Sequence, residues 1–220
     1  MKREIIQTSD GSTTIYLPDM DENYHSTHGA IQEAEHVFIK HGLREMEERK
    51  PDKVAIFEMG FGTGLNAFLT KIRSKSTIEY TGIEAFPVSN AEIEALNYVE
   101  LAGEEFSNDF NLIHQAEWNE LVTIDANFSL KKVEEKIEVF SMPSEAFDLI
   151  YFDAFGPRAQ SEMWNIEILQ KMYDGLKFDG ALVTYSARGQ LKRDLKSLGF
   201  MVESLPGPPG KREMTRAWKK

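Results

Sequence analysis

The sequence predicts an α/β fold with a mostly parallel sheet, and three observations lead to that prediction. Strand-like and helix-like segments alternate after residue 50, a glycine-rich turn joins the first of these strands to its helix, and no helix separates the last two strand-like runs. Alternation implies right-handed crossovers and a sheet covered by helices on both faces. With 220 residues and 41% hydrophobic content, the chain can bury one sizeable core. We therefore expect one main domain over residues 51–220, preceded by an N-terminal extension over residues 1–50.

The N-terminal extension contains two recognisable elements. Residues 13–17 are typical of an edge strand, and residues 29–40 of a helix with one apolar side formed by Ile31, Ala34, Val37 and Phe38. Four polar residues that could be imagined as a metal site follow the strand or lie in the helix: His25, His28, Glu33 and His36. Their spacing matches no known pattern of metal ligands. We therefore expect no metal, and we expect the extension to cover the loop side of the sheet as a lid.

The main domain is predicted from hydrophobic runs and their spacing. Strands are expected over residues 54–59, 78–85, 147–152 and 180–185, and helices over residues 65–74, 90–101, 164–176 and 190–198. Residues 200–204 and 215–218 are separated only by the Pro-Gly loop at 206–210, which is too short for a helical crossover, so they should pair antiparallel. Residues 103–146 give the weakest pattern, with a strand over 127–133 followed by a turn over 134–138.

Composition and charge exclude several classes of protein. The chain has no cysteine, which excludes disulfides and thiolate metal sites, and no apolar run is long enough to span a bilayer. The first residues lack the apolar region of a signal peptide, so we expect a cytoplasmic protein. The net charge of −11 argues against general nucleic-acid binding. However, residues 188–220 hold nine basic and three acidic residues, a local charge of +6, which leaves −17 for residues 1–187.

The glycine-rich turn follows the first strand of the main domain and indicates a nucleotide cofactor. Its spacing is G-x-G-x-G over Gly60, Gly62 and Gly64, with Glu58 two residues before the first glycine. Glycine is needed where the backbone takes positive φ or where a ligand comes close to it. The dinucleotide fingerprint would require a small residue where Leu65 stands. The pattern therefore favours S-adenosylmethionine over NAD.

Two further acids follow strands of the predicted sheet. Glu84 ends the second strand, twenty residues after Gly64, where a carboxylate can accept hydrogen bonds from both ribose hydroxyls. Asp153 follows the buried strand 147–152 beside the same crevice, where open α/β sheets bind substrates. A carboxylate at that place either orients a substrate amine or receives its proton. With the antiparallel end of the sheet, this arrangement is typical of class I methyltransferases.

The order and spacing of the motifs, taken together, resemble the MnmC/MnmD family of tRNA methyltransferases over about residues 20–217. The matching segments are Tyr24-His25-Ser26, Glu35-His36-Val37-Phe38, Glu58-Met59-Gly60-Phe61-Gly62-Thr63-Gly64-Leu65-Asn66, Glu84-Ala85-Phe86-Pro87, Phe152-Asp153-Ala154-Phe155-Gly156-Pro157, Met163-Trp164, Thr184-Tyr185-Ser186-Ala187 and Gly210-Lys211-Arg212-Glu213-Met214. The resemblance implies methylation of 5-aminomethyl-2-thiouridine at tRNA position 34 to 5-methylaminomethyl-2-thiouridine. It also implies a stand-alone methyltransferase without the flavin domain, and therefore no FAD.

The resemblance and the motifs together assign candidate site residues. The cofactor S-adenosylmethionine is expected to contact Glu58, Gly60, Phe61, Gly62, Thr63, Gly64, Asn66, Glu84, Ala85 and Phe86, with the adenine contact open between Glu117 and Glu135. Asp153 is the expected proton acceptor or orienting group. The tRNA substrate is expected to contact Tyr24, Ser26, Phe155, Gly156, Pro157, Lys211 and Arg212. Tyr24 and Phe155 would flank the target base or the sulfonium, or else belong to the core, and Lys211 and Arg212 would contact phosphate.

Three other functions are compatible with parts of this pattern. A small-molecule amine methyltransferase would use the same cofactor. An aminopropyltransferase of the polyamine type would also use a glycine loop and two strand-end acids, but it should line its site with more acids to hold a polycation. A noncatalytic RNA-binding module would explain the basic C-terminal residues, but not the convergence of Glu58, Glu84 and Asp153 on one crevice.

Overall fold

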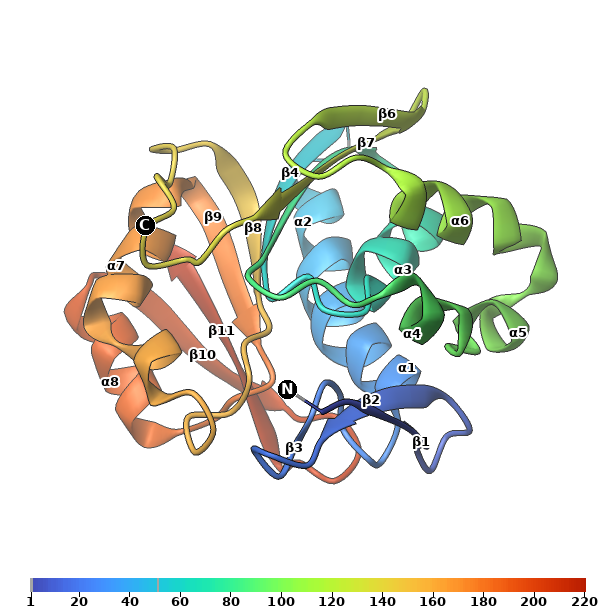
Figure 1. The fold of residues 1–220 in the computed structure, drawn as a ribbon. Coiled ribbons are helices and arrows are strands. Elements are labelled where there is room, and N and C mark those ends of the chain that lie inside the picture. Colours follow the sequence, from blue (N-terminus) through green and yellow to red (C-terminus); the bar gives the residue numbers. More distant parts are fainter. Residues whose placement is uncertain (1, 51) are drawn as a thin grey trace.

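An eight-stranded sheet with strand order β10-β11-β9-β8-β4-β5-β7-β6 forms the centre of the protein (Figure 1). The structure is a computed structural model that describes residues 2–50 and 52–220. The strands are β4 (Lys53–Met59), β5 (Thr77–Glu84), β6 (Leu121–Asp125), β7 (Phe128–Glu134), β8 (Phe147–Phe152), β9 (Leu176–Thr184), β10 (Phe200–Pro206) and β11 (Glu213–Lys219). The five strands from β7 to β9 in this order pair in parallel, whereas β11 pairs antiparallel with both β9 and β10. The predicted mostly parallel sheet and its antiparallel last strand are confirmed.

Helices cover both faces of this sheet (Figure 1). They are α1 (Ala30–Ala34), the π-helical η1 (Glu35–Leu43), α2 (Arg44–Arg49), α3 (Leu65–Arg73), α4 (Asn90–Glu94), α5 (Tyr98–Ala102), α6 (Ser107–Gln115), α7 (Ile166–Gly175) and α8 (Gly189–Ser197), with 3-10 turns at η2 (Glu104–Phe106) and η3 (Ser161–Trp164). Along β4, Val54 and Ile56 pack into the core beneath η1 and α3, while Ala55 and Phe57 pack into the core beneath α7 and α8. The two-residue period of a strand thus supplies both apolar layers.

The N-terminal extension divides between a small sheet and the main core. Strands β1 (Glu4–Gln7), β2 (Thr13–Leu17) and β3 (Glu22–Asn23) form an antiparallel sheet with β2 in the middle. The prediction of an edge strand at 13–17 was therefore wrong about its place, because β1 and β3, with four and two residues, are too short to show a strand pattern. The predicted helix extends through η1 and α2 to Arg49, and its buried Val37, Phe38 and Leu43 belong to the main core.

Four other predictions differ from the structure in their boundaries. The helix expected over 90–101 is broken into α4 and α5, because the backbone N–H of Asn97 donates to Thr13 Oγ1 of β2 at 3.0 Å instead of to a carbonyl of the preceding turn. The Asn97 side chain adds two bonds to the same region: its Oδ1 accepts the N–H of Thr13 at 2.8 Å, and its Nδ2 donates to the Gly11 carbonyl at 2.9 Å. The helix expected from 164 begins at Ile166, and the strand expected from 180 begins at Leu176. In the weak region 103–146, the strand near 127–133 is confirmed as β7, but α6 and β6 were missed. Within the described residues, no helix has the length and apolar character needed to cross a membrane.

Candidate active site

The glycine loop lies between β4 and α3 and requires glycine at each of its three positions. Gly60, Gly62 and Gly64 have φ angles of 91°, 51° and 73°, in the left-handed region that other residues avoid. A Cβ atom on Gly60 would lie 2.6 Å from the backbone oxygen of Asp153, and one on Gly62 would lie 3.1 Å from the ring of Tyr24. The loop is therefore closed tightly against β8 on one side and against the N-terminal extension on the other.

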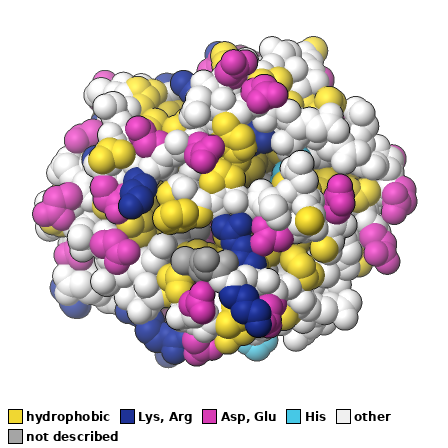
Figure 2. Space-filling view, in the orientation of Figure 1, with side chains coloured by type: hydrophobic (Ala, Val, Ile, Leu, Met, Phe, Trp, Pro, Cys, Tyr) yellow, Lys and Arg dark blue, Asp and Glu magenta, His cyan; other side chains and the backbone are white. Residues whose placement is uncertain are grey.

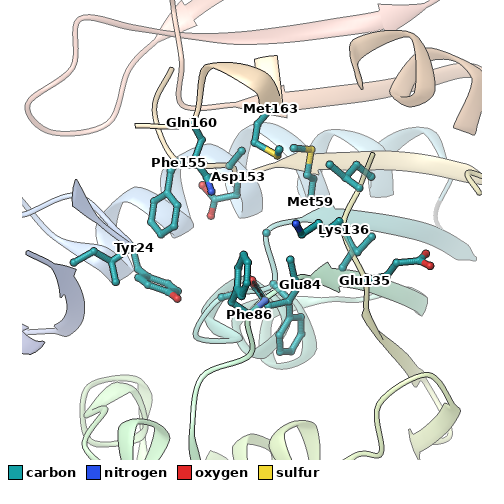
Figure 3. Close-up of a pocket in the computed structure, with 18 of the residues that line it drawn as sticks. Tyr24, Met59, Glu84, Phe86, Glu135, Lys136, Asp153, Phe155, Gln160 and Met163 are labelled. Atoms are coloured by element: carbon teal, nitrogen blue, oxygen red, sulfur yellow. Dashed lines mark hydrogen bonds between the residues drawn. The ribbon is translucent and has the colours of Figure 1, made fainter. Parts of the chain in front are cut away.

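A cavity of about 320 Å³ opens above this loop, at the carboxyl ends of β4, β5 and β8. Figure 2 shows hydrophobic side chains gathered around the middle of one face, with acidic side chains near them. Figure 3 shows the aromatic rings of Tyr24, Phe86 and Phe155 around the cavity. Its lining includes Arg3, Leu17, Met20, Tyr24, Gly60, Phe61, Gly62, Asn66, Glu84, Ala85, Phe86, Glu135, Asp153, Phe155, Gln160 and Met163. Four of these belong to residues 1–24, so the N-terminal extension forms one wall.

Glu84 is held in a fixed orientation at the end of β5. Its Oε2 accepts the backbone N–H of Gly62 at 3.0 Å, and its Oε1 accepts the backbone N–H of Phe86 at 2.9 Å. A carboxylate has about four acceptor sites, so both oxygens keep a lone pair for a ligand. Of the two residues considered for the adenine contact, Glu135 lines the cavity, whereas Glu117 is exposed and does not.

Glu58 is placed differently from the prediction. It does not line the cavity but is completely buried beneath it, where its oxygens accept hydrogen bonds from Asn66 Nδ2 at 2.9 Å and from the Tyr80 hydroxyl at 2.8 Å. Burial raises the pKa of Glu58 well above its ordinary value. Thr63 and Gly64 also lie outside the lining, and the Thr63 hydroxyl accepts a hydrogen bond from Tyr98 at 3.2 Å. These residues support the loop from below.

Asn66 links Glu58 to the cavity. Its Nδ2 also donates to Asp153 Oδ2 at 2.8 Å, so one amide group holds both carboxyl groups. The opposite atom, Asn66 Oδ1, is buried and has no hydrogen-bond partner among the described residues. Because buried polar atoms are normally paired, this orphaned acceptor on the cavity wall fits a ligand that donates a hydrogen bond.

Asp153 stands where two cavities meet. A second cavity of about 290 Å³ lies on its other side and is lined by Glu22, Asn23, Tyr24, His25, Ser26, Thr27, Glu33, Asp153, Ala154, Phe155, Gly156, Tyr185 and Lys211. The pKa of Asp153 is raised to about 7, mainly by burial and also by the nearby carboxylate of Glu33, although Asn66 and Lys211 act in the opposite direction. A carboxyl group with a pKa near neutrality can both take up and release a proton at physiological pH.

The second cavity has aromatic walls and a charge pair. The rings of Tyr24 and Phe155 meet edge to face with their centroids 5.0 Å apart, and the Tyr185 hydroxyl donates to the Ala154 carbonyl at 2.8 Å. Burial raises the pKa of Tyr24 to about 12, so its hydroxyl stays neutral. Lys211 forms an ion pair with Glu33 on this wall.

The position of Lys211 corrects part of the sequence-based interpretation. We expected Lys211 and Arg212 together at the rim of the crevice, but Lys211 is engaged inside the second cavity, whereas Arg212 is exposed. Ser26 and Gly156 line the second cavity as well, but Pro157 lines neither cavity. A contact of Lys211 or Arg212 with phosphate stays a prediction.

Several lining residues were missed by sequence analysis. Glu33 was considered only as a metal ligand, and Tyr185 only as part of a motif; Arg3, Asn23 and Gln160 were not considered. Tyr185 follows the end of β9, so its strand-end position was a usable signal, whereas Glu33 lies within a helix and gave none. Among the described residues, no group of three or more His, Cys, Asp or Glu side chains is arranged to hold a metal ion.

This combination of fold and site defines a class of protein. A glycine loop after the central strand, a carboxylate at the end of the next strand and an antiparallel terminal hairpin are the features of a class I methyltransferase. A family model described as S-adenosyl-L-methionine-dependent methyltransferase matches residues 96–220, more than half of the chain, and the chain belongs to this family. The expected fold class and the dependence of the family on S-adenosylmethionine are confirmed.

Individual relatives agree with this assignment. The tRNA 5-methylaminomethyl-2-thiouridine biosynthesis bifunctional protein MnmC of Cupriavidus metallidurans is 28% identical over 97% of this chain and 33% of its own length. This chain thus spans about a third of such curated relatives. The crystal structure of MnmC2 from Aquifex aeolicus matches with a TM-score of 0.79 at 26% identity, over 100% of this chain and 70% of that one. The resemblance to the MnmC/MnmD family is confirmed.

A more distant structure shares the fold alone. A probable spermidine synthase from Corynebacterium glutamicum matches with a TM-score of 0.54 at 15% identity, over 99% of this chain and 77% of that one. Because one fold supports many reactions, the choice between amine acceptors has to come from the site and not from this similarity.

Proposed function

We propose that this protein transfers a methyl group from S-adenosylmethionine to the primary amine of 5-aminomethyl-2-thiouridine at tRNA position 34. The product is 5-methylaminomethyl-2-thiouridine. The observation that carries this proposal is the placement of Asp153, which among the described residues is the one carboxylate that lines both cavities. The similarity to MnmC and MnmC2 supports the choice of substrate. Since methyl transfer is not a redox step, no FAD is required, and a tRNA substrate implies a cytoplasmic location.

The larger cavity fits the cofactor. Gly60, Phe61 and Gly62 would approach it through backbone atoms, because a Cβ atom on Gly60 or Gly62 would already meet neighbouring residues. The free lone pairs of Glu84 would accept hydrogen bonds from the ribose hydroxyls of the cofactor, and Ala85, Phe86 and Glu135 would lie beside its adenine. Asn66 Oδ1 would accept a hydrogen bond from the amino group of the cofactor's methionine part. When bound, S-adenosylmethionine supplies an electrophilic methyl group.

The second cavity fits the acceptor. A primary alkylamine is largely protonated near neutral pH, and the ammonium form has no lone pair with which to attack. Asp153 would take that proton and pass it to water. The nitrogen lone pair would then form a bond to the methyl carbon as the methyl–sulfur bond breaks, with S-adenosylhomocysteine as the leaving group. The methylated nitrogen carries a positive charge at that stage and would release a proton to water to give the secondary amine. Tyr24 and Phe155 would hold the base through their ring faces and edges. Holding the nitrogen at near-attack distance from the methyl carbon lowers the activation free energy by up to about 7–11 kcal/mol in ideal cases.

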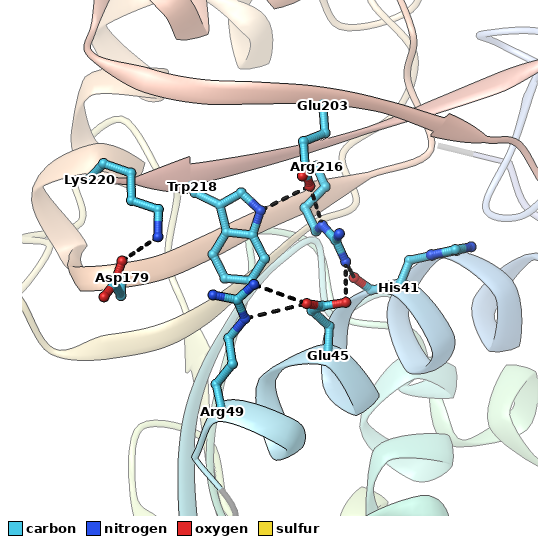
Figure 4. Close-up of polar contacts among 8 residues, drawn as sticks. All are labelled: His41, Glu45, Arg49, Asp179, Glu203, Arg216, Trp218 and Lys220. Atoms are coloured by element: carbon cyan, nitrogen blue, oxygen red, sulfur yellow. Dashed lines mark hydrogen bonds and ion pairs between the residues drawn. The ribbon is translucent and has the colours of Figure 1, made fainter.

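Binding of tRNA has to overcome the net charge of −11 through a local basic surface. Among the nine basic residues of 188–220, the ion-paired ones are Lys192, Lys211, Arg216, Lys219 and Lys220. Figure 4 shows one such group, in which Arg216 bonds to Glu45 at 2.9 Å and to Glu203 at 2.7 Å, and thereby fixes β11 to α2. Within the described part of the chain, Arg188, Arg193, Lys196 and Arg212 form no ion pair. These four are our candidates for phosphate contact.

The test is a methylation assay with tRNA that lacks the modification. Total tRNA from cells that lack the modification is incubated with the protein and isotopically labelled S-adenosylmethionine, and the nucleosides are analysed by mass spectrometry. We expect one labelled methyl group on the aminomethyl nitrogen of the position-34 uridine. Parallel reactions contain small-molecule amines with S-adenosylmethionine or with its decarboxylated form. Unlabelled tRNA together with methyl or aminopropyl transfer to a small-molecule amine would contradict the proposal.

A further inference from the structure

The ammonium group of Lys211 is fixed from two sides on the wall of the second cavity. Lys211 lies in the loop between β10 and β11 and is bonded to Glu33 of α1, and its Nζ stands 3.8 Å from the centroid of the Tyr185 ring. The other oxygen of Glu33 accepts the backbone N–H of Ser26 at 3.0 Å. Since both carboxylate oxygens of Glu33 are bonded, the direction of the Lys211 ammonium is set by the fold.

This ion pair changes the charge that an acceptor meets. The ionisable carboxylates of the second cavity are Glu22, Glu33 and Asp153, and burial lowers the pKa of His25, which also lines it, to about 4, so that this imidazole is neutral. Without Lys211, three carboxylates would face the acceptor, and such a site would favour an acceptor with several positive charges. With Lys211, Glu33 is neutralised and Asp153 has a cation nearby. Among the described residues, Glu22 and Asp153 then remain as the carboxylates of this cavity without an ion pair. The cavity is therefore less negative than it would be without Lys211, and it disfavours a second positive charge on the acceptor by comparison.

Hydrogen-bonding capacity on this wall remains unused. An ammonium group has three N–H donors, and Lys211 gives one to Glu33. Asn23 lines the same cavity, and its Oδ1 is buried without a hydrogen-bond partner among the described residues. A donor and an orphaned acceptor that line the same cavity match a ring edge that presents a carbonyl oxygen beside an N–H group. In a pyrimidine with an aminomethyl group at C5, the amine, the C4 carbonyl and the N3–H group follow one another along one edge.

We propose that Lys211 determines the acceptor specificity of this site. Its ammonium donates a hydrogen bond to the ring carbonyl next to the reacting amine and excludes acceptors with a second cationic group, while Asn23 accepts the ring N–H. This inference rests on the proposed function and deepens it. It also gives Lys211 a contact with the base instead of a contact with phosphate. A site that hydrogen-bonds its substrate rejects analogues that lack the partner group, because its own buried groups are then left unpaired.

The first arm of the test measures methylation of tRNA by variants of Lys211. Lys211→Met keeps the length of the side chain but removes both charge and donor, whereas Lys211→Arg keeps both. We expect Lys211→Met to raise KM for tRNA at least tenfold, with S-adenosylmethionine affinity within about twofold of wild type as measured by calorimetry. Lys211→Arg should recover most of the loss. An unchanged KM in Lys211→Met would overturn the assigned contact.

The second arm needs no turnover and separates this inference from the proposed function. Calorimetry with spermidine, in the presence of S-adenosylhomocysteine, should show at least tenfold tighter binding to Lys211→Met than to wild type, because Glu33 is then unpaired. The double variant Glu33→Gln/Lys211→Met removes both members of the ion pair, so it adds no negative charge to the cavity and should lose that gain. It also controls for misfolding of the single variant. Equal spermidine affinity in all three proteins would overturn the inference, even if wild type methylates tRNA. Failure of wild type to methylate tRNA would contradict the proposed function alone.

Discussion

The two cavities that meet at Asp153 are built in different ways. Most of the cofactor cavity comes from residues at the ends of β4, β5, β7 and β8 or just after them, and its shape depends on backbone conformation at Gly60 and Gly62. The acceptor cavity is assembled from side chains that are far apart in the sequence, such as Glu33 and Lys211, which are separated by 178 residues. Cofactor binding thus depends on a local motif, and acceptor choice depends on long-range contacts.

Substitution of Asp153 should give the largest difference between the two cavities. Asp153→Ala removes the group that we propose as acceptor of the amine proton, so we expect turnover to fall about a hundredfold or more, the usual scale for loss of a general base. Affinity for S-adenosylmethionine, measured by calorimetry, should change much less. Asp174→Ala, which alters an exposed acid on α7, is the matched control and should leave both quantities unchanged. Near-normal turnover in Asp153→Ala would remove this residue from the mechanism.

The same carboxyl group should reduce stability as the pH rises. Its folded-state pKa of about 7 lies above the ordinary value of 3.8, so between these values the folded protein binds more protons than the unfolded chain and the free energy of unfolding falls with increasing pH. Asp153→Asn removes this titration. We expect the free energy of unfolding of this variant, relative to that of wild type, to rise by on the order of 1–3 kcal/mol between pH 4 and pH 8, as measured by urea denaturation. A constant difference across this range would contradict the raised pKa.

Substitution in the glycine loop should affect cofactor binding most. Gly62→Val places a branched side chain at a φ of 51° and against the Tyr24 ring, so we expect S-adenosylmethionine affinity to fall at least tenfold, about 1.4 kcal/mol. Gly11→Val is the control, because Gly11 has a φ of 87° but open space around its Cβ position. Gly11→Val should lower the stability of the protein without lowering its affinity for S-adenosylmethionine. Strong binding of NAD but not of S-adenosylmethionine by wild type would contradict the assignment of the loop.

The smallest effect is expected for the phosphate contacts. Arg212→Ala should lower the magnitude of the slope of log affinity for tRNA against log salt concentration by about 0.7–0.9. Lys211→Met should weaken tRNA binding with little change in this slope, because its ammonium lies inside the acceptor cavity. A slope that changed for Lys211→Met and not for Arg212→Ala would reverse these two roles.

Sequence analysis predicted the cofactor cavity better than the acceptor cavity, and the comparison above explains why. The strand, glycine loop and helix around Gly60 are contiguous, and Glu84 and Asp153 occupy strand ends that a parallel sheet brings together. The pairing of Glu33 with Lys211 depends on how a helix and a distant loop pack, which no local pattern encodes.

The residues around the loop show a second limit of sequence analysis. An acid before a glycine motif was expected to contact the cofactor, yet Glu58 is buried and bonded to Asn66 and Tyr80. Sequence spacing gave its place at the end of β4 but not the direction of its side chain. Similarly, the short strands β1 and β3 and the break at Asn97 depend on contacts with other segments, so periodicity did not predict them.

The dependence of the methylation rate on pH tests the central claim, that Asp153 serves the acceptor and not the cofactor, most directly. Single-turnover rates are measured with saturating S-adenosylmethionine and tRNA for wild type and for Asp153→Asn, which can still accept the hydrogen bond from Asn66. We expect the wild-type rate to rise with pH through about 7, as Asp153 ionises. In the variant the rate should be at least a hundredfold lower near neutral pH, with its rise moved to the higher pKa of the substrate amine. The same profile and a similar rate in both proteins would contradict the claim.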